Sequence, residues 1–405
     1  MDRLFVATAS NLRWAAWVSN DRLVEFHAER LGQESLVGNI YLGRIVGTEK
    51  RLDAAFVDIG GERPAFLPLR KAHEPPVDGA MVVVQVERDG HDGKAPRVTT
   101  QAVLKGGRLI LTPRRRGVTV SDRITDKGAR AQLAGLVKAI AEPGEGWTVR
   151  TAAERAGSEI LQEEAGRLRA LWRDISTRAA AEKPPTCLYR EPAIELRLLR
   201  DHGARFGEVV LDGRAPAEAA RAWSASEHLD MAPKIAFRRQ NDWVPSPEEI
   251  FEQVDDALET RAGLPSGGTV SFEQTAALMA IDVDSAGAGG LPAEMGGERL
   301  FLQTNLEAAE AIAWQLRLRN IGGIVVIDFI DLKDAAARHR VVDRLRAAVE
   351  PDSASCWVGS MSRLGLVEMT RRRRGPTLAA LLVEPCDGCG GTGWRRRAMT
   401  PGRAV

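Results

Sequence analysis

The sequence has no run of about eighteen apolar residues, the length that a membrane-spanning helix needs. Its first thirty residues carry charged side chains within an alternating, strand-like pattern, which argues against a secretory signal peptide. Cysteine is scarce, with Cys187 and Cys356 isolated and Cys386 close to Cys389. This distribution is typical of a reducing cytosol and not of a disulfide framework. We therefore expect a cytoplasmic protein without a membrane span.

A surplus of one charge sign is also absent, because 56 lysine and arginine residues balance 55 aspartate and glutamate residues. A net charge of +1 neither requires nor excludes a nucleic-acid partner. Arginine is concentrated in short runs, and its planar side chain suits phosphate, although such runs are more often just a solvated surface. The runs are 114–116, 238–239, 371–374 and 395–397. The length of 405 residues predicts two or three domains.

Two short segments place aspartates within apolar strands. Over residues 280–285, apolar residues alternate with Asp282 and Asp284, so a strand would put both carboxylates on one face. In the second segment, 324–331, four β-branched residues predict a strand buried on both sides that ends at Asp328. Carboxylates at the ends of neighbouring strands are typical ligands of a divalent cation. The alternative is that each aspartate merely ends a strand.

A helix is predicted between these two strands, over Asn305–Asn320. Thr304 or Asn305 would be its N-cap, and Gly322-Gly323 would stop it. Strand, helix and strand in this order predict an α/β layer with its chemistry at the strand ends. Helical spacing predicts further helices over 129–141, 159–178, 193–199, 216–223, 250–259 and 338–349.

The N-terminal part reads as short strands. Asn20-Asp21 predicts a hairpin turn between two of them. Residues 36–111 contain several short β segments with glycine turns, which predict a small closed barrel of the OB type. Such barrels bind single strands through aromatic stacking and basic side chains, whereas phenylalanines in strands are more often core residues. The candidate face comprises Tyr41, Arg44, Phe56, Phe66 and Lys94.

Cys386 and Cys389 lie on a glycine-rich turn, a pattern typical of half a zinc site. A closed structural site needs four ligands. Cys187 and Cys356 fall in different predicted units, so a second copy of the same tail is the simpler source of the other two. A redox pair and a zinc-free turn remain alternatives.

Taken together and in order, the motifs resemble the ribonuclease E/G family of bacterial single-strand-specific endoribonucleases, from about residue 3 to residue 394. The segments that carry the resemblance are 37–44, 54–60, 149–152, 264–268, 304–309, 315–319, 327–331 and 386–393. The resemblance implies an α+β multidomain fold. An RNase H-like piece would comprise residues 1–35 and 191–258, interrupted by an OB-type RNA-binding barrel (36–111) and a 5′-sensor (112–190). A DNase I-like α/β catalytic domain (259–381) and a zinc-link tail (382–405) would follow.

The resemblance also implies roles for single residues. Asp282 and Asp328 match the two carboxylates that hold Mg²⁺, with Mn²⁺ as a substitute, and Asp284 stands where the family usually has an asparagine. Arg150 and Thr151 match the pair that grips a 5′-monophosphate, supported by the loop around Gly117 and Val120. Phe56, Phe66 and Lys94 match the positions that hold single-stranded RNA. Cys386 and Cys389 match a Zn²⁺ link between protomers of a homodimer or tetramer.

The implied activity is metal-dependent cleavage of single-stranded RNA, in rRNA and mRNA processing and decay. It would leave 5′-phosphate and 3′-hydroxyl ends and would favour 5′-monophosphorylated substrates. Asp284 motivates the alternative, a non-catalytic RNA-binding protein of the same fold, because a third negative charge beside the cation site would repel the scissile phosphate when no cation is bound.

Overall fold

The computed structural model describes residues 1–72, 74–90, 94–285, 297–373, 375–384 and 386–388. The chain divides into two units, of which one comprises Met1–Arg22 and His27–Ser246 and the other comprises Leu23–Phe26 and Pro247–Val405. The second unit therefore includes a short piece of the N-terminal region. None of the helices in the described ranges is long and apolar enough to cross a membrane.

The first unit begins with a mixed sheet in the order β15-β14-β1-β2-β3, apart from Leu23–Phe26 of β3, which belong to the second unit. Its strands are β1 (Asp2–Ala9), β2 (Leu12–Ser19), β3 (Arg22–Arg30), β14 (Phe206–Leu211) and β15 (Ile235–Phe237). β1 pairs antiparallel with β2 and parallel with β14, which joins the N-terminus to a segment far along the chain. Asn20 and Asp21 have φ angles of 49° and 61°, as a tight hairpin turn requires, and the predicted turn is confirmed. Helices α3 (Ile194–His202) and α4 (Arg214–Ser226) flank β14 in the sequence.

A closed barrel forms the next part of the first unit. Its strands are β4 (Ile40–Glu49), β5 (Ala54–Asp58), β6 (Ala65–Pro68), β7 (Met81–Arg88) and β8 (Arg97–Thr99). The order is β4-β5-β6-β8-β7, and β7 pairs back to β4, so the sheet closes on itself. β13 (Thr186–Tyr189) adds to the other side of β4. A closed five-stranded barrel is confirmed and is consistent with an OB-type domain, but its strands end at Thr99, and the last part of the predicted range (36–111) belongs to another sheet.

A four-stranded sheet completes the first unit, in the order β11-β12-β10-β9. Its strands are β9 (Leu104–Lys105), β10 (Leu109–Pro113), β11 (Gly117–Val120) and β12 (Glu145–Val149). Helices α1 (Lys127–Ile140) and α2 (Ser158–Ala181) pack on it around one apolar core. Asp126 caps α1, because its carboxylate accepts a hydrogen bond from the Ala129 amide at 2.6 Å. The sheet is mixed, because β10 pairs antiparallel with β9 and β12, whereas β11 pairs parallel with β12.

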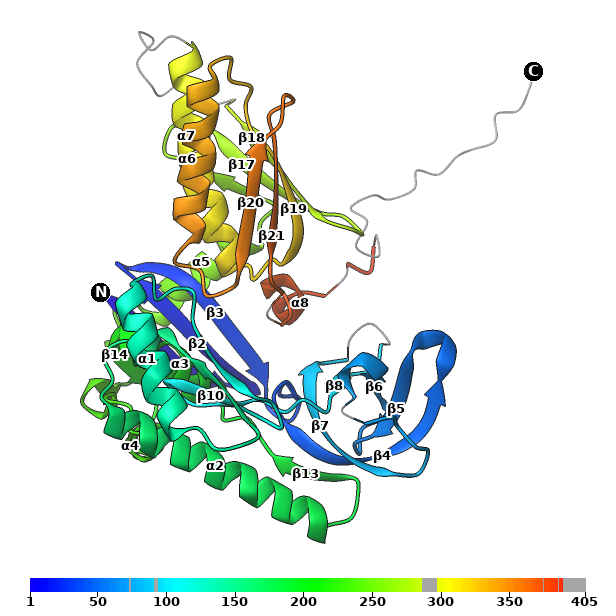
Figure 1. The fold of residues 1–405 in the computed structure, drawn as a ribbon. Helices are drawn as coiled ribbons and strands as arrows, with labels where there is room; N and C mark the ends of the chain where they lie inside the picture. The colour runs from blue at the N-terminus through cyan, green and yellow to red at the C-terminus, as the bar shows by residue number, and fades with distance from the viewer. Residues whose placement is uncertain (73, 91–93, 286–296, 374, 385, 389–405) are drawn as a thin grey trace. The chain divides into compact units, whose positions relative to one another are not determined.

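The second unit is a six-stranded sheet in the order β16-β17-β18-β19-β21-β20 (Figure 1). Its strands are β16 (Arg261–Gly263), β17 (Thr269–Gln274), β18 (Met279–Asp284), β19 (Gly323–Asp328), β20 (Cys356–Met361) and β21 (Leu366–Arg371). Its helices are α5 (Pro247–Leu258), α6 (Gly297–Leu318), α7 (Ala335–Val349) and α8 (Leu378–Leu382). β18 and β19 are parallel neighbours connected through α6, so the predicted strand–helix–strand unit is confirmed.

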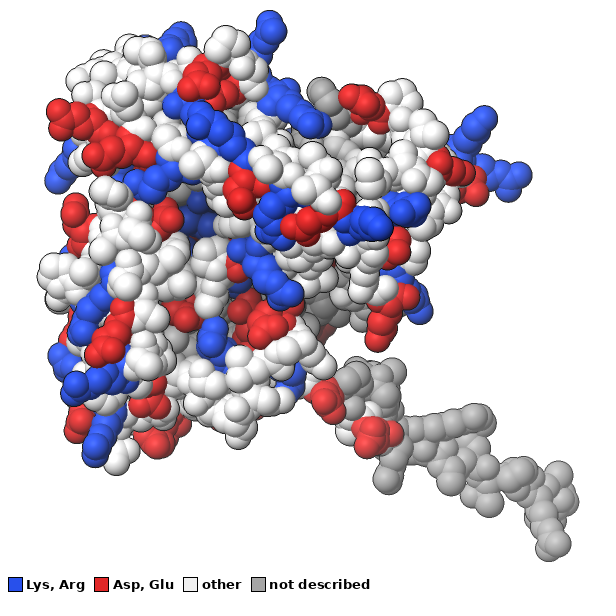
Figure 2. Space-filling model, turned by 90° about the horizontal axis from the view of Figure 1, so that it is seen from below, with Lys and Arg blue, Asp and Glu red and all other residues white. Residues whose placement is uncertain are grey.

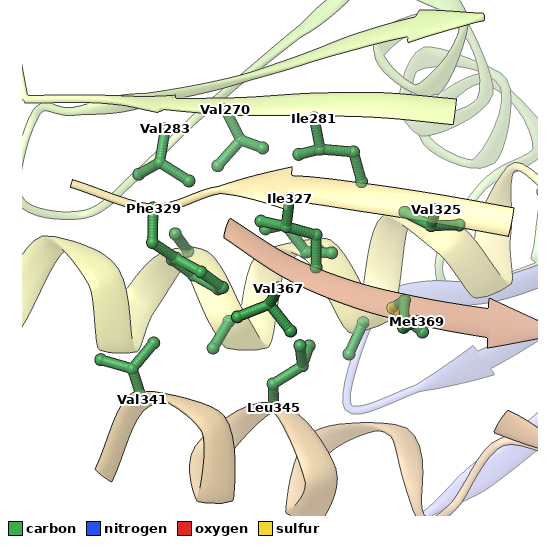
Figure 3. Packing of buried hydrophobic residues seen from close by; sticks show 14 of the residues in the cluster. Val270, Ile281, Val283, Val325, Ile327, Phe329, Val341, Leu345, Val367 and Met369 are labelled. Carbon is green, nitrogen blue, oxygen red and sulfur yellow. The ribbon is translucent and has the colours of Figure 1, made fainter. Parts of the chain in front are cut away.

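One face of this sheet packs against α6 and α7. Figure 3 shows the side chains of Ile327, Phe329 and Val367 pointing toward the helices, from which Val341 and Leu345 approach them. All five are buried. This core fixes which face of each strand points outward, and the aspartates of β18 and β19 lie on the outward face.

Two expectations about this region were wrong. The run of β-branched residues in β19 is not buried on both sides, because Ile324 is 52% exposed on the face that the two helices leave open. The helix between the acidic strands extends back to Gly297, so Thr304 and Asn305 are not caps but fully buried residues inside α6. Polar residues that are typical of caps are here needed for buried hydrogen bonds.

Candidate functional site

Three aspartates named from the sequence lie on one face of the second unit's sheet. Asp282 in β18 and Asp328 in β19 are direct partners in the parallel pairing of the two strands. Asp284 follows two residues after Asp282 and therefore points to the same side. All three are exposed, whereas their neighbours Ile281 and Val283 are buried. The alternating pattern thus brings the carboxylates together at the C-terminal ends of adjacent strands.

Asp331 joins this group, although the sequence alone gave it no role. A Cβ atom built on Gly365 would lie 3.1 Å from one carboxylate oxygen of Asp331 and 3.9 Å from one of Asp328. Gly365 lies in the turn between β20 and β21, so this proximity comes from a hairpin distant in sequence. Burial, together with the negative charges of Asp282 and Asp331, raises the pKa of Asp328. The group therefore concentrates negative charge that a cation would compensate.

The paired carboxylates fit a magnesium ion better than an ion whose ligands all come from the protein. Among the described residues, no group of three or more histidine, cysteine, aspartate or glutamate side chains has the arrangement of a metal site. Mg²⁺ typically takes only one or two carboxylates and completes its shell with water and substrate phosphate. The paired Asp282 and Asp328, both exposed, match that requirement.

Asn305 holds the segment that follows β19. Its side-chain amide donates to the Ile330 carbonyl at 2.8 Å, and its carbonyl oxygen accepts from the Ile330 amide at 3.0 Å. Asn305 is fully buried in α6, so these two bonds fix the backbone between Asp328 and Asp331 from inside the unit. In the sequence, the one indication that Asn305 holds this backbone is that a polar residue stands on the buried, apolar face of the predicted helix.

The backbone at Gly365 gives a first prediction. Gly365 has a φ of +80°, and an added Cβ would lie 2.9 Å from the Phe329 carbonyl oxygen and 3.1 Å from Asp331. We expect Gly365→Ala to destabilise the unit by about 1–2 kcal/mol, the usual cost of the left-handed conformation, and to lower activity by displacing Asp331. Urea unfolding followed by circular dichroism measures the first effect. Gly375→Ala, where φ is +103° but an added Cβ meets no atom within 4 Å, is the matched control. If Gly375→Ala lost as much activity as Gly365→Ala, the close approach of Gly365 to Asp331 would not be what matters for activity.

The barrel places Phe56, Phe66 and Arg44 on its outer surface. Tyr41, which the sequence also named for this face, packs against the barrel core instead, because it lies three residues from Arg44 in β4 and points to the other side. Phe56 in β5 and Phe66 in β6 are direct cross-strand partners, with ring centroids 6.1 Å apart at 73°. Both are half-buried, whereas the alternate residues of these strands fill the barrel interior. Arg44 in β4 is the register partner of Asp58 in β5. Because Asp58 lies two residues after Phe56, Arg44 is on the same face of the sheet as Phe56.

Two further basic residues belong to this description. Lys94 is exposed and directly follows residues outside the described ranges. Arg97 in β8 is the register partner of Phe66 and was not named from the sequence. Arg97 could not be predicted from local sequence spacing, because β6 and β8 become neighbours only when the barrel closes.

The residues named for 5′-end sensing lie at the ends of two parallel strands. β11 ends at Val120 opposite Val149 of β12, and Arg150 and Thr151 follow directly. The hydroxyl of Thr151 lies 3.2 Å from that of Ser121, which links the two strand ends. Gly117 lies at the other end of β11, about 10 Å of strand away, so the structure does not bring it next to Arg150.

Arg150 belongs to a cluster of charged residues in the first unit, which we call the Arg150 cluster: Lys105, Arg150, Glu191, Arg200 and Asp201. Arg150 Nη1 lies 2.8 Å from Asp201 Oδ1 and donates to the Gly106 carbonyl at 2.6 Å. Arg200 pairs with Glu191 at 2.7 Å and with Asp201 at 3.3 Å. Burial opposes ionisation of Asp201, but the charges of Arg200, Arg150 and Lys105 outweigh it and hold its pKa well below the ordinary value.

The cysteines are described only in part. Cys386 is exposed, and Cys389 lies outside the described residues. Cys187 and Cys356 are half-buried and belong to different units. The surface charge is mixed, because Figure 2 shows lysine and arginine side chains interspersed with acidic ones over the face in view.

Comparison with known proteins places these sites in a family. A model of the ribonuclease E/G family matches residues 103–374, which include Arg150, Asp282 and Asp328. The chain is 32% identical to ribonuclease G of Haemophilus influenzae over 399 residues, covering 93% of this chain and 81% of the relative. The chain belongs to the ribonuclease E/G family. The predicted family, and with it the prediction of an enzyme of the ribonuclease E/G type, is therefore confirmed.

The extent of the match differs between the two kinds of relative. The chain is also 32% identical to ribonuclease G of Escherichia coli over 399 residues. It is 34% identical to ribonuclease E of the same organism over 417 residues, which cover 97% of this chain but 39% of that protein. Most of a ribonuclease G is therefore matched, and less than half of a ribonuclease E.

Proposed function

We propose that this protein is a metal-dependent cytoplasmic endoribonuclease that cleaves single-stranded RNA in RNA processing and decay. Cleavage leaves 5′-phosphate and 3′-hydroxyl ends. The observation that carries the proposal is the direct pairing of Asp282 with Asp328 at the ends of parallel strands, within the region that matches the ribonuclease E/G family. Relatives named ribonuclease G and ribonuclease E, at 32–34% identity, support the substrate class.

In this mechanism Asp282 and Asp328 hold Mg²⁺, or Mn²⁺ in its place. When bound, the ion supplies an activated water for in-line attack and charge stabilisation for the phosphate. Asp328 is held by strand pairing to both β18 and β21, so the two carboxylates keep their spacing without substrate. Asp284 lies on the same face, where its negative charge would repel the scissile phosphate unless a bound cation compensated it.

The substrate is bound by the first unit. Phe56 and Phe66 present half-buried rings on the outer barrel face, where they can stack on bases. Arg44 and Lys94 contact the backbone phosphates, which makes affinity fall with salt as counterions are released. The two rings pack edge to face on each other on the outer face, and because each is only half-buried, part of its surface is available to a base.

A 5′-monophosphate binds at Arg150 and Thr151, with support from the backbone near Val120, which lies opposite Val149, and not from Gly117 at the far end of β11. Arginine suits a terminal phosphate because it donates two parallel hydrogen bonds. The closeness of the Thr151 and Ser121 hydroxyls supports this site, since both are small donors beside Arg150. We expect 5′-monophosphorylated RNA to be cleaved faster than the same RNA with a 5′-hydroxyl or 5′-triphosphate. Equal rates on the three ends would contradict sensing without touching the cleavage chemistry.

The finer architecture belongs to the same proposal. The β1–β3 sheet with the residues near 191–258 forms the RNase H-like piece, into which barrel and sensor are inserted, and residues 259–381 form the DNase I-like catalytic domain.

Cys386 and Cys389 share one Zn²⁺ with a second protomer, and the exposed thiol of Cys386 is available for that link. Solution mass and zinc content of Cys386→Ser, compared with Cys187→Ser, test it. An unchanged mass would contradict the link.

One experiment tests the activity. A fluorescent single-stranded oligoribonucleotide with a 5′-phosphate is incubated with the purified protein in Mg²⁺, in Mn²⁺ and in EDTA, and the product ends are mapped by mass spectrometry. We expect cleavage with either metal, none in EDTA, and 5′-phosphate products. Cleavage in EDTA, or 2′,3′-cyclic phosphate products, would contradict the metal-dependent mechanism.

A non-catalytic RNA-binding protein is the second candidate, and Asp284 is the observation that favours it. Tight salt-sensitive binding without products under any metal would establish it. Restoration of cleavage by Asp284→Asn would then identify that charge as the cause.

A further inference from the structure

We propose that Asp201 is a positioning residue for 5′-phosphate recognition: it holds Arg150 by one nitrogen so that the opposite edge of the guanidinium is presented to the phosphate. This inference rests on the proposed 5′-end sensing. It adds a residue about fifty positions away in sequence, on a different element, whose role is to orient a phosphate-binding side chain and not to touch the phosphate.

The contacts of Arg150 are uneven. The Nη1 atom of Arg150 lies 2.8 Å from a carboxylate oxygen of Asp201 and donates a hydrogen bond to the Gly106 carbonyl at 2.6 Å. Within the described part of the chain, Nε and Nη2 make no hydrogen bond. These two nitrogens lie on one edge of the planar group and form the fork that binds two phosphate oxygens at once. The protein therefore fixes one end of the guanidinium and leaves the bidentate edge available.

Asp201 is itself held in place. Its neighbour Arg200 reaches it at 3.3 Å and pairs with Glu191 at 2.7 Å. The side chains of Arg200 and Glu191 are only 3% and 4% exposed, so this pair is anchored in the interior of the first unit. The Glu191 amide in turn donates to Asn39 at 2.9 Å. A chain of contacts thus runs from the interior through Arg200 and Asp201 to Arg150, and it limits the rotamers that Arg150 can adopt.

The charge of the Arg150 cluster also favours an anion. Lys105, Arg150 and Arg200 supply three positive charges, and Glu191 and Asp201 supply two negative ones. The adjacent carboxylate of Glu164 is balanced by Arg108 at 3.6 Å. One positive charge is therefore left over. Without Asp201 the excess would be larger, but Arg150 would lose the contact that sets its orientation.

The opposite role, in which Asp201 competes with the phosphate for Arg150, predicts an opposite result. Competition requires that the aspartate occupy the edge that the phosphate needs. Asp201 approaches Arg150 most closely at Nη1, which also donates to the Gly106 carbonyl, and Nε and Nη2 make no hydrogen bond with the described residues, so the geometry favours orientation over competition.

The test compares two oligoribonucleotides of identical sequence, one with a 5′-phosphate and one with a 5′-hydroxyl, cleaved by the full chain and by Asp201→Asn. The measured quantity is the ratio of kcat/KM on the two ends. We expect Asp201→Asn to lower this ratio about tenfold, the usual effect of removing a group that orients a ligand, and to leave the rate on the 5′-hydroxyl substrate unchanged. Asp201→Glu, which retains the charge, should recover part of the ratio.

A double-mutant cycle shows whether Asp201 acts through Arg150. In an Arg150→Gln background, Asp201→Asn should have no further effect on the ratio. If the unaltered protein shows a ratio of one, the proposed sensing itself is wrong. If the unaltered protein discriminates and Asp201→Asn discriminates equally well or better, sensing stands and the positioning role is overturned. Equal loss on both substrates would also overturn it, since a general loss of structure moves both rates.

Discussion

Asp328→Asn is expected to lower kcat for RNA cleavage about a thousandfold while the affinity for single-stranded RNA stays unchanged. Asp328 is one of the two carboxylates proposed to hold the cation, and loss of one pre-organised electrostatic group at a reacting centre typically costs 10²–10³ in rate. The proposed RNA contacts lie in the other unit and are untouched by the change. Single-turnover cleavage with saturating protein measures the rate, and fluorescence anisotropy in EDTA measures the affinity.

Asp343→Asn is the matched control for this substitution. Asp343 is a highly exposed carboxylate on α7 of the same unit and forms a surface pair with Arg346 at 3.2 Å. Such pairs contribute little to stability, so near-normal activity is expected. Cleavage by Asp328→Asn within tenfold of the unaltered rate would show that the paired aspartates are not the cation site.

Asn305→Ala is expected to have the largest effect on stability and to reduce activity as well. The change leaves the amide and the carbonyl of Ile330 without their partners, at about 1–3 kcal/mol for each buried group that stays unpaired. Because Ile330 lies between Asp328 and Asp331, the same loss frees the backbone that positions both carboxylates. Urea unfolding gives the free energy, and the cleavage assay gives kcat.

Gln303→Ala controls for the loss of an amide from the same helix. Gln303 is exposed on α6, and its side-chain amide donates to the Glu307 carboxylate at 2.9 Å. We expect a change of less than about 0.5 kcal/mol, as for ordinary surface positions. If Asn305→Ala were no less stable than Gln303→Ala, the two bonds to Ile330 would not hold this segment.

The sequence predicted the acidic face because its evidence was local. Alternation of Asp282 and Asp284 with apolar residues fixes the side on which the carboxylates lie, whichever strands are their neighbours. The strand–helix–strand order then predicted that β18 and β19 are parallel neighbours. The exact pairing of Asp282 with Asp328 followed from the strand register and was visible only in the structure.

The remaining features depended on contacts distant in sequence. A run of β-branched residues does not tell whether helices cover one face or two, so the exposure of Ile324 was missed. Asp331 joined the site through a hairpin at Gly365, and Asp201 met Arg150 through α3. Asn305 was mistaken for a cap because a buried asparagine and a capping asparagine look alike until the helix start is known.

The small N-terminal piece of the second unit has a practical consequence for dissecting this protein. Within that unit the indole of Trp314 donates to the Leu23 carbonyl at 2.6 Å, and Arg317 pairs with Glu25 at 2.6 Å, with both side chains only 10% exposed. A fragment that begins at Pro247 lacks Leu23–Phe26 and leaves the Arg317 charge without Glu25. Removing one partner of a buried ion pair strongly destabilises the folded state. Expression of the carboxylate-bearing half alone therefore requires residues 23–26 to be supplied as well, for example by a fused or added peptide.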